Sequence, residues 1–208
     1  MPPAVEPLTI VVLGSGTSVG VPMLGCRCAV CMSADPRDKR LRPSVLVRRG
    51  ARNILIDTTP DLRFQGLRAG ISRLDAILFT HAHADHLMGL DDVRPLSLHR
   101  EAPIPVYGSP ETVAAIRRCF CYAFDGQKKE SSIPRLELHT LDGEPFDVCG
   151  LPVTPVPVMH GSLRIYGFRF GRAAYITDQS GIPAESMEKL RGLDTLFLDG
   201  LRHAFHPT

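Results

Sequence analysis

The chain has 208 residues and a mass of 22.8 kDa, with 44% hydrophobic and 22% charged residues. This composition predicts one domain with a sizeable core, and it excludes low-complexity disorder and, because the apolar runs fall well short of about 20 residues, a membrane span. The formal net charge of +2 is too balanced to indicate a nucleic-acid or membrane surface by itself.

The first segment, residues 1–7, has no basic region followed by an apolar run. We therefore expect no secretory signal and a cytoplasmic location. Residues 8–13 form a short β-rich stretch that is followed by a glycine, which is typical of a strand.

A glycine-rich turn and three closely spaced cysteines occupy residues 14–31. The cysteines are Cys26, Cys28 and Cys31. Three thiols this close cannot all pair with one another, whereas structural zinc is commonly held by three cysteines and one histidine. The spacing predicts a zinc loop at residues 14–31 whose fourth ligand lies elsewhere, and redox-inert cysteines in a loop are the alternative. Three further cysteines lack metal spacing and are interpreted as ordinary core or loop residues, namely Cys119, Cys121 and Cys149.

Extended and helical patterns alternate along the rest of the chain. Strands are predicted at residues 44–48, 53–56, 74–79, 103–107, 136–141, 153–158, 165–170, 173–177 and 195–198. Helices are predicted at residues 62–69, 111–120 and 183–191. Many strands with a few interposed helices favour a layered α/β architecture, with sheets inside and helices outside.

The strongest candidate for chemistry follows directly after the strand predicted at residues 74–79. Its donor residues are His81, His83, Asp85 and His86. In an extended segment His81 and His83 project to the same side, and a turn into the next helix brings Asp85 and His86 toward a second ion. Imidazole and carboxylate ligands suit Zn, Mn or Fe, and a core without metal would leave many polar groups in need of partners.

These four residues, in the order H-x-H-x-D-H, resemble the motif that defines the metallo-β-lactamase superfamily. The similarity extends along most of the chain. Residues 54–57 look like the family's preceding strand and its acidic residue, residues 158–161 like the loop with a third histidine, and residues 175–178 like the strand that ends in a metal-bridging aspartate. The resemblance implies an α/β fold of the αββα metallo-β-lactamase sandwich type, with the site at one edge.

The resemblance also implies the ligand set. His81, His83 and His160 would hold one divalent ion, Asp85 and His86 a second, and Asp178 would lie between the two. Asp57 would orient a ligand histidine, because ligating imidazoles usually donate their other N–H to a carboxylate.

Residues 13–22 and the cysteine loop that follows are similar to the PhnP-like group, phosphoribosyl cyclic phosphodiesterases that resemble the tRNA 3′-processing endonucleases. The resemblance implies opening of a small cyclic phosphodiester, such as 5-phosphoribosyl 1,2-cyclic phosphate, by a hydroxide held between two ions of Zn or Mn. It also implies a homodimer. No membrane partner is expected, and nucleic acid is the less favoured substrate.

Asp85, beside its ligand role, and His206 are the candidate catalytic residues. Residues 206–208 look like the start of the group's H-P-[ST]-H segment, although a solvent-exposed terminal histidine is the alternative. The group's last T-H-x-x-H motif is absent from the sequence. We therefore expect a single domain over residues 1–208 that is C-terminally truncated, binds metal poorly and has little activity.

Two alternative functions stay open. An RNA endonuclease of the tRNA 3′-processing kind would share the ligands but would need a basic, extended arm. Residues 121–135 are short and mixed in charge, and we interpret them as a mobile surface insertion over the site, which favours a small substrate. A non-catalytic zinc-binding interaction module is the second alternative, and the intact ligand cluster argues against it.

Overall fold

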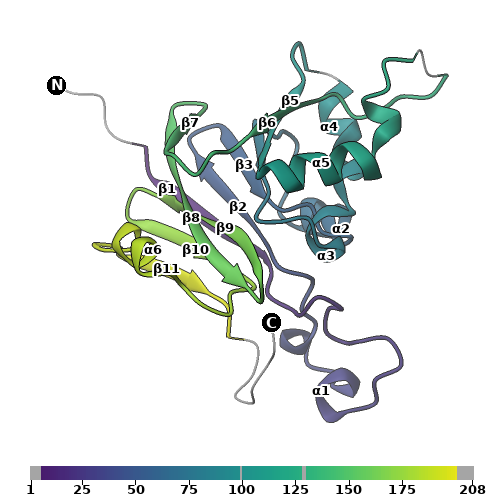
Figure 1. Ribbon diagram of the computed structural model, residues 1–208. Helices are drawn as coiled ribbons and strands as arrows, with labels where there is room; N and C mark the ends of the chain where they lie inside the picture. Colours follow the sequence, from purple (N-terminus) through teal and green to yellow (C-terminus); the bar gives the residue numbers. More distant parts are fainter. Residues whose placement is uncertain (1–5, 99, 128–129, 201–208) are drawn as a thin grey trace.

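The computed structural model describes residues 6–98, 100–127 and 130–200. Two β-sheets pack face to face, and helices cover both outer faces (Figure 1). This arrangement is the αββα sandwich expected from the sequence. No helix in the described ranges is long and apolar enough to cross a membrane.

The first sheet has six strands, in the spatial order β1 to β6. They are β1 (Leu8–Gly14), β2 (Ser44–Arg49), β3 (Arg52–Ile56), β4 (Ala76–Leu78), β5 (Ile104–Gly108) and β6 (Leu136–Thr140). Strands β1 to β3 pair antiparallel, whereas β3 to β6 pair parallel. Because parallel neighbours end at the same edge of a sheet, the loops after β3 and β4 meet there.

The second sheet has five strands, in the order β11-β10-β9-β8-β7. They are β7 (Phe146–Val148), β8 (Leu151–His160), β9 (Leu163–Phe170), β10 (Ala173–Ile176) and β11 (Thr195–Leu198). All neighbours pair antiparallel except β10 and β11, which are parallel. His160 is the last residue of β8, and Asp178 follows two residues after β10.

Helices α2 to α5 cover the first sheet and α6 covers the second (Figure 1). Their bounds are α2 (Leu62–Arg68), α3 (Ala84–Leu87), α4 (Arg94–Leu98), α5 (Pro110–Cys119) and α6 (Ala184–Lys189). Three 3-10 helices lie at Pro36–Asp38, Leu90–Val93 and Cys121–Ala123. The short helix α1 (Ala29–Met32) lies in the loop between β1 and β2, which projects from the sandwich.

The alternation of side chains along β3 divides the core into two layers. Ile54 and Ile56 face the second sheet and pack in a cluster with Phe168, whereas Leu55 faces the helices and packs in a cluster with Ile116. All of these side chains are almost fully buried. Successive residues of a strand point to opposite faces, so a strand covered on both faces is apolar throughout.

All ten predicted strands and all three predicted helices are present, with ends that shift by a few residues. Strand β7 was not predicted, because three residues are too few to show a period. Helices α1, α3 and α4 have four or five residues each and were missed for the same reason.

Gly89 provides a test of the packing next to the candidate site. A Cβ at this position would lie 1.9 Å from the backbone oxygen of Thr59, and no side-chain movement can relieve a clash with backbone. We expect Gly89→Ala to lower the free energy of unfolding by about 2–3 kcal/mol, measured by urea denaturation. Gly181→Ala is the matched control, since a Cβ there meets nothing within 4 Å and should change stability by less than about 0.5 kcal/mol. Equal stability of the two variants would contradict the expectation.

Candidate active site

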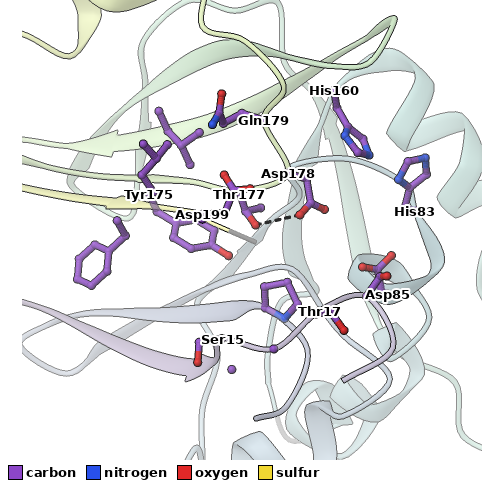
Figure 2. Close-up of a pocket in the computed structure, with 18 of the residues that line it drawn as sticks. Ser15, Thr17, His83, Asp85, His160, Tyr175, Thr177, Asp178, Gln179 and Asp199 are labelled. Atoms are coloured by element: carbon purple, nitrogen blue, oxygen red, sulfur yellow. Dashed lines mark hydrogen bonds between the residues drawn. The ribbon is translucent and has the colours of Figure 1, made fainter. Parts of the chain in front are cut away.

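Four loops at one edge of the sandwich bring the predicted donor residues together. Asp57, the cluster His81–His86 and Asp178 follow β3, β4 and β10, and His160 ends β8 where its loop begins. Figure 2 shows His83, His160, Asp85 and Asp178 around one cavity. Residues from distant parts of the sequence therefore converge, as the family resemblance implied.

The first group of donors consists of His81, His83 and His160, whose candidate ligand atoms all lie within 4.8 Å of one another. His81 Nε2 lies 3.0 Å from His83 Nδ1. Burial lowers the pKa of His81 to about 3, and burial also lowers the pKa of His160. The imidazole of His81 is thus neutral at neutral pH, which is the form that binds a cation.

The second group consists of His81, His86 and Asp178, again within 4.8 Å. Asp178 Oδ2 lies 2.7 Å from His86 Nε2 and 3.6 Å from His81 Nε2. Asp85 Oδ2 lies 3.3 Å from His86 Nε2. Burial opposes ionisation of Asp178, but its hydrogen bond to His86 and the charge of that imidazole outweigh burial and lower its pKa to about 2. One carboxylate oxygen therefore lies next to both groups.

The buried carboxylate of Asp57 orients two of the histidines. Its Oδ2 accepts hydrogen bonds of 2.8 Å from His86 Nδ1 and from Thr80 Oγ1, and its Oδ1 accepts one of 2.8 Å from the Thr80 N–H. Thr80 Oγ1 in turn lies 3.0 Å from His81 Nδ1 and can accept a hydrogen bond from its N–H. Both rings then carry their proton on Nδ1 and leave Nε2 free toward the site. The sequence predicted the role of Asp57 but not that of Thr80.

Charge and burial act against each other in this buried network. Burial raises the pKa of Asp57, which has no exposed surface. Burial also opposes protonation of His86, but the charge of Asp57 and the hydrogen bond to Asp178 outweigh it and raise the pKa of His86 well above its usual range. A cationic group is therefore favoured at this point, and a metal ion can replace the proton on His86 Nε2.

Asp57 and Asp178 have left-handed backbone conformations, with φ of 62° and 55°. Only Cys149 shares a positive φ among the non-glycine residues that the structure describes. Such conformations are uncommon for residues other than glycine and are concentrated at functional sites. Here they turn each carboxylate into the site within two residues of a strand end, a feature without a signal in the sequence.

The orphaned polar atoms of the site test whether metal ions fit it. Within the described ranges, His86 Nε2 and His160 Nδ1 are buried and make no well-aligned hydrogen bond, although Asp178 Oδ2 lies 2.7 Å from His86 Nε2. A buried polar atom without a good partner is costly, and a cation would satisfy both. Histidine nitrogens and carboxylate oxygens are also ligands that divalent Zn or Mn accepts. The residues present therefore fit divalent metal ions.

The cysteine loop forms a separate candidate centre. The thiols of Cys26, Cys28 and Cys31 lie within 4.8 Å of one another. Hydrogen bonds from the Cys31 backbone and the Cys26 thiol lower the pKa of Cys28 to about 7, which favours the thiolate that binds zinc. The predicted cluster is thus formed. The other three cysteines are exposed and lie outside the core. Cys119 ends α5, Cys121 begins a 3-10 helix, and Cys149 lies in the turn between β7 and β8.

A cavity of about 1200 Å³ opens beside the candidate metal ligands. Its walls include side chains that the sequence did not single out, among them Ser15, Thr17, Arg40, Tyr175 and Asp199. The glycine-rich turn after β1 was a signal for Ser15 and Thr17. None of residues 121–127 and 130–135 lines the cavity, and in Figure 1 this segment lies at the upper right, away from α3 and the carboxyl end of β8. His206 lies outside the described residues.

Comparisons with known proteins agree with this geometry. A family model described as "Beta-lactamase superfamily domain" matches residues 52–207. The crystal structure of a "new diphosphatase from the PhnP family" superposes with a TM-score of 0.90 and 53% sequence identity, over 97% of this chain and 76% of that one.

Two curated relatives bear other names. An octanoyltransferase of Porphyromonas gingivalis is 45% identical over 195 residues, which are 93% of this chain but only 39% of the relative. The chain thus spans about two fifths of that protein's length. A ribonuclease Z of a Bradyrhizobium strain is 35% identical over 141 residues, 65% of this chain and 46% of the relative.

Proposed function

The chain belongs to the β-lactamase superfamily and has the metallo-β-lactamase fold, and from this premise we propose that it hydrolyses a phosphodiester of a small phosphorylated sugar or nucleotide. The observation that carries the proposal is the position of Asp178 Oδ2, which lies next to both histidine groups. A carboxylate in this place suits a pair of metal ions. A 5-phosphoribosyl 1,2-cyclic phosphate is the substrate that the sequence resemblance favours.

In the proposed reaction, water adds to phosphorus, one ring P–O bond breaks, and the leaving oxygen takes up a proton. Two divalent ions, when bound, would lower the pKa of the attacking water and stabilise charge on the phosphoryl oxygens. His81, His83 and His160 would hold one ion, and His86 and Asp85 the other, with Asp178 shared. Asp57 keeps the proton of His86 on Nδ1. Asp85 is also a candidate catalytic residue, in addition to its proposed role as a metal ligand.

Other residues of the cavity wall support a phosphorylated substrate. Arg40, Ser15 and Thr17 line the cavity, and Arg40 is exposed. A guanidinium can bind two phosphate oxygens at once. Cleavage of a diphosphate link is a second candidate, favoured by the 53% identity to the PhnP-family diphosphatase. Precursor tRNA is the third substrate to test, because of the similarity to ribonuclease Z.

Metal removal tests the proposal. We expect the protein with saturating Mn or Zn to open 5-phosphoribosyl 1,2-cyclic phosphate at the low rate that the absence of the T-H-x-x-H motif implies. It should lose this activity on addition of a chelator and regain it when the ion is restored. Activity on a nucleoside diphosphate sugar alone would favour the diphosphatase candidate, and cleavage of precursor tRNA alone would favour the nuclease. Metal binding without hydrolysis of any of the three would support the interaction module and contradict the proposal.

The cysteine loop gives a separate expectation. We propose that it binds one structural zinc ion, and we expect Cys28→Ser to lower the zinc content by about one equivalent per chain. Metal analysis of the purified variant measures this. Cys119→Ser is the matched control, because that cysteine belongs to neither candidate centre. Unchanged zinc content in Cys28→Ser would contradict the proposal. The homodimer and the cytoplasmic location stay predictions from the sequence.

A further inference from the structure

The buried polar atoms of the described chain leave one part of the cavity unexplained. Four buried side-chain nitrogen or oxygen atoms in the described residues make no well-aligned hydrogen bond. Two of them, His86 Nε2 and His160 Nδ1, belong to the candidate metal ligands. The other two are the hydroxyl of Tyr175 and Oδ1 of Asp199, and both residues line the same cavity. An unpartnered buried polar atom costs free energy, and a ligand that hydrogen-bonds to these two atoms would remove that cost.

The position of Tyr175 is set by the core. Its ring packs between the two sheets with residues such as Ile56 and Phe168, and only 7% of the residue is exposed. Burial raises the pKa of Tyr175 and the charge of Asp57 raises it further, which outweighs the opposing effect of the neighbouring Thr177 side chain. The phenol therefore stays protonated and can donate a hydrogen bond.

The position of Asp199 follows from strand register. Strands β10 and β11 are parallel, and Ile176 pairs with Leu198. The residues that come next, Thr177 and Asp199, therefore leave the sheet side by side at the edge that carries Asp178. In Figure 2, Asp178 lies between the histidines His83 and His160 on one side and Tyr175 and Asp199 on the other. The unpartnered pair is thus adjacent to the candidate reaction centre.

We propose that Tyr175 and Asp199 form a subsite that binds a hydroxyl group on the sugar portion of the substrate, an inference that rests on the proposed function. A secondary hydroxyl offers one donor and can also accept. It can donate to Asp199 Oδ1 and can accept from the Tyr175 hydroxyl. Both residues are then specificity-determining residues for the sugar rather than part of the metal centre.

The charges around the pair exclude the other obvious ligand, a second phosphate. Asp199 lies close enough to Asp178 for that charge, together with burial, to raise the pKa of Asp199. A phosphate placed against these carboxylates would be repelled. A neutral donor suits the position better, and Arg40, which also lines the cavity, offers a phosphate a more favourable partner.

A pair of substrates that differ in one hydroxyl tests the subsite. In 5-phosphoribosyl 1,2-cyclic phosphate the 3-hydroxyl is the one free hydroxyl, and the 3-deoxy analogue lacks it. We expect Asp199→Asn and Tyr175→Phe each to lower kcat/KM on the ribosyl substrate about tenfold. On the deoxy analogue the same variants should stay within about twofold of the unmodified protein. Metal content should not change.

Matched controls come from elsewhere in the fold. Asp194→Asn alters an exposed carboxylate that pairs with Arg172 just before β11, and Tyr107→Phe alters a ring stacked on His139 in the first sheet. Both variants should leave the ratio of kcat/KM on the ribosyl substrate to kcat/KM on the deoxy analogue unchanged. Equal losses on both substrates for Asp199→Asn and Tyr175→Phe, or no loss at all, would overturn the proposal. No loss of activity is the result expected if a fixed water molecule, rather than the substrate, hydrogen-bonds to the Tyr175 hydroxyl and to Asp199 Oδ1.

A binding measurement separates this inference from the proposed reaction. Titration calorimetry of the metal-loaded protein with ribose 5-phosphate and with its 3-deoxy analogue requires no turnover. We expect the hydroxyl to tighten binding about tenfold in the unmodified protein and to have no effect in Asp199→Asn. If no phosphodiester is hydrolysed but this difference is found, the proposed function fails and the subsite stands. Equal affinities for both compounds would overturn the subsite even if hydrolysis is observed.

Discussion

Replacing Asp178 by asparagine is expected to lower kcat for hydrolysis roughly a thousandfold, which corresponds to about 4 kcal/mol of transition-state stabilisation. Asparagine has nearly the same shape and tolerates the left-handed backbone that Asp178 adopts, with φ of 55°. The fold should therefore persist. What is lost is the negative charge on the oxygen that lies 2.7 Å from His86 Nε2 and 3.6 Å from His81 Nε2.

Metal analysis beside steady-state kinetics measures this effect. We expect Asp178→Asn to lose at least part of its active-site metal, and circular dichroism should show an unchanged fold. Asp92→Asn is the matched control, because Asp92 is an exposed carboxylate at the start of a 3-10 helix. Full activity of Asp178→Asn at saturating metal would mean that the carboxylate is not needed between the two ions.

The sequence predicts well the metal-ligand residues that are close together in the chain and the order of strands and helices. The cluster His81–His86 lies within six residues after a buried strand, so local geometry alone places it at a sheet edge. Residues distant in the sequence were assigned through resemblance, and the structure places His160 and Asp178 beside the cluster. Their convergence depends on the pairing of strands, which no local pattern encodes.

The features that the sequence did not predict depend on backbone conformation and on tertiary packing. The left-handed φ of Asp57 aims its carboxylate at Thr80 and His86, and nothing in the sequence around it marks that conformation. No pattern in the sequence singles out Asp199. Its importance is visible only when the parallel register of β10 and β11 brings it beside Asp178. The segment 121–135 was predicted over the site, but its described residues do not line the cavity, since the first sheet and α5 direct it elsewhere.

Replacing Asp57 should separate its structural effect from its effect on metal binding. Asp57→Ala removes the acceptor for His86 Nδ1 and for two donors of Thr80, all of them buried. We expect a loss of about 3–5 kcal/mol in the free energy of unfolding, measured by urea denaturation. Asp57→Asn keeps one oxygen for the Thr80 N–H and should lose much less stability.

In Asp57→Asn the main change is instead the position of the proton on the His86 ring. An amide nitrogen in place of Oδ2 donates and cannot accept, so His86 Nδ1 must become the acceptor and Nε2 must carry the proton. A protonated Nε2 cannot bind a metal ion, and the hydrogen-bonded path through Thr80 to His81 is disturbed as well. We expect metal affinity and activity to fall about 10–100-fold, with the change of tautomer visible in the ¹⁵N NMR shifts of the metal-free protein. Unchanged metal affinity with a shifted tautomer would mean that His86 Nε2 does not bind the metal, and the ligand set proposed for the second ion would be wrong.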